Sequence, residues 1–138
     1  MGASLSACLW EYFGDDVFRG RRVISAAKWN GCQLSHMVIP QLKVCALSQE
    51  PTRDLLKVDK ASLLATDLNI PQAWGLVIQT HPAKFDAIKF TSRFIDLPCL
   101  ARFDRGGMAA RLRATTLGNL KDLDVAVDWI DEREAALV

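Results

Sequence analysis

Motifs for metal sites, disulfides and membrane spans are missing from this sequence of 138 residues. Its two histidines, His36 and His81, stand far apart and form no HExxH pair, so we expect no metal site. Its four cysteines show no CxxC spacing and we expect no secretory leader, which predicts reduced thiols in a cytoplasmic protein. No apolar run approaches the roughly 18 residues that span a bilayer, so we expect no contact with a membrane.

The sequence also has no large excess of positive or negative charge. Seventeen Lys and Arg against sixteen Asp and Glu give a formal net charge of +1, so no global field favours direct binding to nucleic acid. The cluster of Arg19, Arg21 and Arg22 follows two aspartates and is typical of a mixed-sign surface loop. Gly106 and Gly107 lie outside any GxGxxG or GxxxxGK[ST] pattern, which indicates a loop and not a phosphate cradle.

The N-terminal segment has apolar residues at helical spacing. It predicts an amphipathic helix over residues 4–13, which Ser4 caps and Gly14 ends. Glu11 falls at the border between the apolar stripe and the solvent-facing side of this helix. By spacing alone, Glu11 is typical of a solvated helix glutamate.

The rest of the chain alternates between short predicted strands and helices. The Pro71 helix stops at His81-Pro82, and the C-terminal helix has an acidic outer face. The expected elements are strands over 33–39 and 42–47, helical turns over 51–58 and 60–65, a helix over 71–81, a strand over 110–116, a helix with the apolar stripe Leu123, Ala126, Val127 and Ile130, and a last strand at 137–138.

Residues 85–105, FDAIKFTSRFIDLPCLARFDR, form two short apolar runs joined by a polar turn. Pro98 cannot continue a central strand, so residues 99–103 are predicted as a second strand antiparallel to the first. Alternation of side chains places Ser92 on the same side as Ile88 and Phe90, at the rim of a buried surface. A lone serine at a strand end also commonly satisfies a nearby backbone group, and the spacing leaves both interpretations open.

Four segments in this order resemble the RES-domain family: VFRGRRVISAAKW, LKVCALS, the Pro71 helix, and the 85–105 stretch. That family is named for an Arg, a Glu and a Ser, and most members are toxins of bacterial toxin–antitoxin pairs that degrade NAD or transfer ADP-ribose from it. The resemblance covers most of residues 5–138. It implies a single α+β domain over residues 1–138, with an ADP-ribosyltransferase-like mixed sheet and flanking helices, lacking the family's N-terminal strands.

The resemblance assigns two site residues. Glu11 in ACLWEYFGDDVF and Ser92 in FTSRF fall where the family has its glutamate and serine, as catalytic and NAD-binding residues. The family's arginine lies well upstream of the glutamate, and the ten residues before Glu11 contain none. A carboxylate at Glu11 suits the positive charge that builds on ribose as nicotinamide leaves, and the Ser92 hydroxyl can hold a ribose or nicotinamide oxygen.

The resemblance also implies partners. NAD is expected as a substrate, with no separate cofactor, and the cognate protein partner is an Xre-type helix-turn-helix antitoxin. A homodimer is left open. Two other functions stay open as well: a catalytically inactive RES remnant that acts only by binding its antitoxin, and a small binding module whose similarity is accidental.

Overall fold

The computed structural model describes residues 2, 4–18, 22–39, 41–65, 67–105, 107 and 112–138. Within these residues the chain has an α+β fold of helices and small sheets. The helices are α1 (Leu5–Phe18), α2 (Ala26–Asn30), α3 (Glu50–Leu56), α4 (Lys60–Leu63), α5 (Asn69–Thr80), the 3-10 helix η1 (Leu120–Asp122) and α7 (Asp124–Asp131). The strands are β1 (Val23–Ile24), β2 (Gln33–Val38), β3 (Val44–Ala46), β4 (Ala87–Thr91), β5 (Pro98–Arg102), β6 (Arg113–Asn119) and β7 (Ala136–Leu137).

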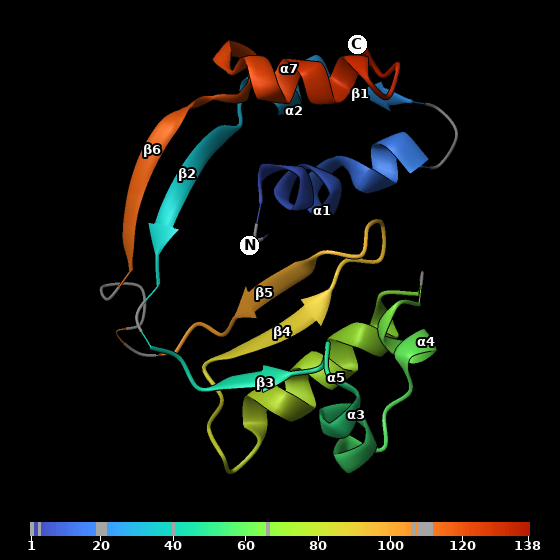
Figure 1. The fold of residues 1–138 in the computed structure, drawn as a ribbon, viewed down its shortest axis with the longest axis vertical. Coiled ribbons are helices and arrows are strands. Elements are labelled where there is room, and N and C mark those ends of the chain that lie inside the picture. Colours follow the sequence, from blue (N-terminus) through green and yellow to red (C-terminus); the bar gives the residue numbers. More distant parts are fainter. Residues whose placement is uncertain are drawn as a thin grey trace.

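The elements stack in layers around α1. Figure 1 shows α1 between a sheet of β3, β4 and β5 on one side and the C-terminal α7 with β1 on the other. Helices α3, α4 and α5 lie beyond the sheet, away from α1. Strand β4 is the central strand, parallel to β3 and antiparallel to β5. The predicted antiparallel pair in residues 85–105 is therefore confirmed.

Two apolar clusters hold these layers together. One packs the buried face of α1 against α2, β1 and α7, with Trp29, Phe13 and Ile24 almost fully buried. The other packs the sheet against α5 through Ile78, Ile88 and neighbouring residues. Each fully buried large apolar side chain contributes about 1.5–3 kcal/mol relative to an exposed one. The helix α1 is thus fixed from one side by a core and presents its other side to the sheet.

A long antiparallel ribbon of β2 and β6 connects the layers. Its register runs from Gln33 opposite Asn119 to Val38 opposite Arg113, and Figure 1 shows it curving along one side of the molecule. The predicted strand over 33–39 is confirmed. The predicted strand over 110–116 extends to Asn119, and its first two residues lie outside the described part of the chain.

The prediction that Gly14 ends the first helix was wrong, because α1 continues to Phe18. Gly14 is buried inside the helix, and a Cβ atom built on it would lie 2.7 Å from ring atoms of Phe94. The glycine thus allows the turn after β4 to approach the helix backbone closely.

Other boundaries shift by a few residues. Strand β3 covers only part of the predicted 42–47 segment. Helix α5 starts two residues before Pro71, so Pro71 lies in the first turn of the helix. A proline is tolerated there because the backbone N–H groups of the first turn have no intrahelical partner. Pro98 is the first residue of β5 rather than part of the turn, and it pairs with Thr91 at the sheet edge, where a missing donor is tolerated.

The C-terminal helix confirms its predicted acidic outer face, but its buried side differs from the predicted stripe. Ala126, Trp129 and Ile130 are buried, whereas Val127 is 38% exposed. The acidic residues that are exposed are Asp122, Asp124, Asp128 and Asp131. The predicted last strand forms as β7, parallel to β1.

Arg19, Arg21 and Gly106, which the sequence places in loops, lie outside the described residues, and Arg22 forms an exposed ion pair with Glu134. Within the described part of the chain, no helix is long and apolar enough to cross a membrane.

Candidate functional site

Glu11 and Ser92 are brought together although 81 positions separate them in the sequence. The Ser92 hydroxyl donates a hydrogen bond to Oε1 of Glu11 over 2.5 Å. Ser92 follows the last residue of β4 and is only 4% exposed. Its Oγ also accepts a hydrogen bond from the Phe94 backbone N–H at 3.2 Å. The interpretation that the serine satisfies a nearby backbone group is therefore confirmed, and the same hydroxyl also contacts a carboxylate.

The next residue makes a second link to the same helix. Nη2 of Arg93 donates to Oδ2 of Asp15 over 2.5 Å. Asp15 lies four positions after Glu11, so the two carboxylates share one face of α1. Two consecutive residues after β4 thus contact two acidic residues one helical turn apart.

An aromatic group fastens the turn that carries these residues. The Phe94 ring is stacked with Trp10 of α1 at a centroid distance of 5.9 Å, and it lies 6.0 Å from the Phe18 ring. The Arg93 guanidinium lies 4.6 Å above the same Phe94 ring. Aromatic pairs of this kind contribute about 0.5–1.5 kcal/mol beyond their buried area. They hold the Ser92–Arg93 backbone against α1.

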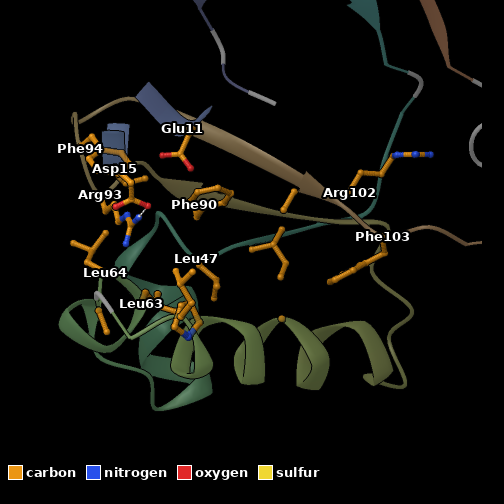
Figure 2. A pocket seen from close by; sticks show the side chains of 17 residues that line it. Glu11, Asp15, Leu47, Leu63, Leu64, Phe90, Arg93, Phe94, Arg102 and Phe103 are labelled. Carbon is orange, nitrogen blue, oxygen red and sulfur yellow. Dashed lines mark hydrogen bonds and ion pairs between the residues drawn. The ribbon is translucent and has the colours of Figure 1, made fainter. Parts of the chain in front are cut away.

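A cavity of about 440 Å³ opens beside the two carboxylates. It lies between the sheet and α5, with α1 at its upper end (Figure 2). Its volume falls within the roughly 300–1,000 Å³ that is usual for small-molecule sites. Its wall is formed by Glu11, Asp15, Leu47, Leu63, Leu64, Ala65, Leu68, Pro71, Gly75, Ile88, Phe90, Thr91, Arg93, Phe94, Ala101, Arg102 and Phe103.

The polar groups of this cavity are concentrated at one end. Glu11, Asp15 and Arg93 gather there, whereas Leu47, Leu63 and most of the remaining wall are apolar (Figure 2). The side chain of Arg102 extends away from the cavity in the same view. Of the two residues predicted from the sequence, Glu11 belongs to the cavity wall, and Ser92 lies behind it. An apolar chamber with a few convergent polar groups is the usual form of a ligand site.

Cys99 of β5 lies near this acidic end. Burial, with a smaller contribution from the Glu11 carboxylate, raises the pKa of Cys99 to about 11. The Cys99 thiol is 2% exposed and belongs to the four free cysteines. Burial favours the protonated thiol, so Cys99 contributes to this region as a small buried packing residue.

The site residues predicted from the sequence did not include Asp15 or Arg93. Asp15 was assigned to a mixed-sign loop after the helix, because the helix was ended at Gly14. The i, i+4 spacing of Glu11 and Asp15, set against the adjacent Ser92 and Arg93, is the signal that points to paired contacts. Among the described residues, no group of three or more His, Cys, Asp or Glu side chains could hold a metal ion.

No known protein family, curated protein or solved structure matches the chain with significant similarity.

Proposed function

We propose that this protein is a RES-type enzyme that consumes NAD, and that the cavity beside Glu11 binds the nicotinamide and ribose of the substrate. The proposal includes an ADP-ribosyltransferase-like fold for the mixed sheet and its flanking helices. The observation that carries it is the hydrogen bond between the buried Ser92 hydroxyl and Glu11 at the wall of a cavity of about 440 Å³.

The chemistry proposed for Glu11 is stabilisation of positive charge on the ribose. When the bond between nicotinamide nitrogen and ribose C1′ breaks, its electron pair leaves with nicotinamide and positive charge develops on the ribose. A carboxylate fixed at the cavity wall stabilises that charge more in the transition state than in the ground state. Water, phosphate or a protein side chain then attacks C1′ and completes hydrolysis or transfer of ADP-ribose.

Ser92 acts in this proposal as a positioning residue. Its hydroxyl proton is directed to Glu11, and its oxygen already accepts from the Phe94 N–H. The serine therefore orients the carboxylate from behind, instead of holding a ribose or nicotinamide oxygen as the sequence suggested. A fixed orientation of this kind removes the cost of ordering the carboxylate during the reaction.

The test is whether the purified protein releases nicotinamide from NAD, with the nicotinamide measured by chromatography. We expect Glu11→Gln to lower the rate by about 10²-fold or more, as for removal of a main electrostatic group in other active sites. Glu50→Gln is the matched control, because it removes the same charge from an exposed residue at the start of α3. Release at the same background rate by wild type and Glu11→Gln would reject the enzyme proposal.

A second candidate is binding without catalysis, to an Xre-type helix-turn-helix partner. The observation that favours it is the outer surface of α5, where Ile70, Leu76 and Val77 are between 40% and 60% exposed. Exposed apolar side chains gathered on one helix are typical of interaction surfaces. Co-purification with a protein encoded beside it that has an Xre-type helix-turn-helix, in the absence of NAD turnover, would support this candidate. Failure to associate with any neighbour-encoded protein would reject it.

A further inference from the structure

The cavity has a cationic group at the end where its carboxylates lie. Arg93 projects there beside Asp15, with Glu11 on the same wall, and the Arg93 side chain is 20% exposed (Figure 2). The other arginine of the wall, Arg102, directs its side chain away from the cavity. Among the described residues of the wall, Arg93 is thus the cation that faces the enclosed space.

We propose that Arg93 is the residue that binds the diphosphate of a dinucleotide ligand in this cavity. In this proposal Asp15 holds the guanidinium in position until the diphosphate takes the place of the Asp15 carboxylate. This inference rests on the proposed function, and it names the group that grips the substrate rather than the group that acts on the bond. The ligand class is a nucleotide that carries a diphosphate, with ADP-ribose as the simplest probe.

The shape of the guanidinium suits this role. It presents five N–H donors in a planar fork, and the ion pair with Asp15 engages its Nη2 atom. Two parallel donors match two oxygens of a phosphate, which gives a stronger and more directional contact than a single ammonium group. The guanidinium also lies 4.6 Å from the centroid of the Phe94 ring, and this cation–π contact does not depend on which anion the fork binds.

Asp15 is a suitable holding partner because its side chain is 47% exposed. An ion pair open to water contributes little, since solvent screens the attraction. A diphosphate carries two negative charges and binds the fork through several oxygens, so it competes well with one half-exposed carboxylate.

A purely structural role for the pair makes a different prediction. If Arg93 and Asp15 served only to fasten the turn after β4 to α1, removing either partner would lower the stability, and neither change would alter ligand affinity in a specific direction. If Arg93 is the phosphate group's partner, Arg93→Gln and Asp15→Asn must shift affinity in opposite directions.

The experiment is calorimetric titration of the full chain with ADP-ribose, which has the diphosphate but no nicotinamide. We expect Arg93→Gln to weaken binding by roughly tenfold or more and Arg93→Lys to restore only part of it, because lysine lacks the fork. We expect Asp15→Asn to strengthen binding severalfold, a gain that misfolding cannot produce. Lys89→Gln is the control, because it removes a positive charge from an exposed position of β4 that lies outside the cavity wall.

The outcomes separate this inference from the proposed function. Binding of ADP-ribose that depends on Arg93, with no nicotinamide release from NAD, would keep the inference and reject the enzyme. Failure of wild type to bind ADP-ribose, or equal affinities in wild type, Arg93→Gln and Asp15→Asn, would overturn the inference. Nicotinamide release that needs Glu11 but not Arg93 would retain the enzyme and also overturn the inference.

Discussion

Gly14 of α1 lies directly against the ring of Phe94, so close that a Cβ atom on Gly14 would come within 2.7 Å of two ring carbons. The contact joins the helix that carries Glu11 to the turn that carries Ser92. Because the ring is also stacked with Trp10, it cannot move aside without breaking other contacts. The short distance between α1 and the turn after β4 therefore depends on the absence of a side chain at Gly14.

We expect Gly14→Ala to destabilise the fold by about 1–3 kcal/mol, the usual cost of overpacking, in spite of alanine's higher helix propensity. Gly75→Ala is the matched control: Gly75 lies inside α5, and a Cβ there meets nothing within 4 Å. It should stabilise the protein by about 0.5–1 kcal/mol. Urea unfolding of both variants measures the difference, and a stabilised Gly14→Ala protein would show that the ring yields freely.

Ser92→Ala tests the link between the serine and the carboxylate. Loss of the hydroxyl leaves the Phe94 N–H without its partner and frees Glu11 to rotate, so we expect a loss of about 1–2 kcal/mol in the free energy of unfolding. In the proposed enzyme, kcat should fall roughly tenfold or more with little change in KM, because the serine acts through Glu11.

The control for this change is Ser35→Ala, on an exposed position of β2. It should alter neither the stability nor the kinetics beyond the usual ±0.5 kcal/mol of a surface substitution. A rise in KM at constant kcat in Ser92→Ala would contradict the positioning role and indicate direct contact with the substrate.

The helix that forms the lower wall of the cavity depends on one buried side chain. Ile78 of α5 is 2% exposed, whereas its neighbour Val77 is 53% exposed. We expect Ile78→Ala to cost about 2–4 kcal/mol through lost burial and the cavity left behind, and Val77→Ala to cost less than about 0.5 kcal/mol. Equal effects in thermal or urea unfolding would mean that α5 does not pack on the sheet through Ile78.

Local rules predicted most of the elements near the site but not how they meet. The alternation of Ile88 and Phe90 and the turn before Pro98 predicted the β4–β5 pair, since period and turn chemistry act over a few residues. The same rules wrongly predicted that α1 ends at Gly14, because helices commonly end at a glycine. The Phe94 ring, whose close approach requires a glycine at this position, lies 80 positions away in the sequence. That error hid Asp15, whose partner Arg93 is likewise distant.

The family resemblance, and not the physics of the residues, assigned Glu11 and Ser92 to one site. Nothing in the spacing of either residue predicts a contact over 81 positions, because long-range pairing depends on how whole layers pack. The structure adds what the resemblance did not imply, namely that the serine stands behind the carboxylate. It also places a second ion pair one turn further along the same helix.

Cys99 provides a test of the charge on Glu11 that needs no substrate. Burial, and then the Glu11 carboxylate, raise the pKa of Cys99 to about 11 from the ordinary value of 9.0. Glu11→Gln removes that charge and keeps the shape, so we expect the pKa of Cys99 to fall, whereas Glu50→Gln should leave it unchanged. A pH titration of the Cys99 ¹³Cβ chemical shift reads the protonation state even though the thiol is buried.

The same shift determines a pH dependence of stability. The unfolded chain loses the Cys99 proton near its ordinary pKa of 9.0, but the folded chain holds it until about pH 11. Since the folded state then binds more protons, the free energy of unfolding should decline between pH 9 and pH 11. Cys99→Ala should flatten part of this decline, and burial raises the pKa of Cys45 as well, so some of it will persist. If Glu11→Gln left the Cys99 titration unchanged, burial and not the Glu11 carboxylate would account for the raised pKa of Cys99.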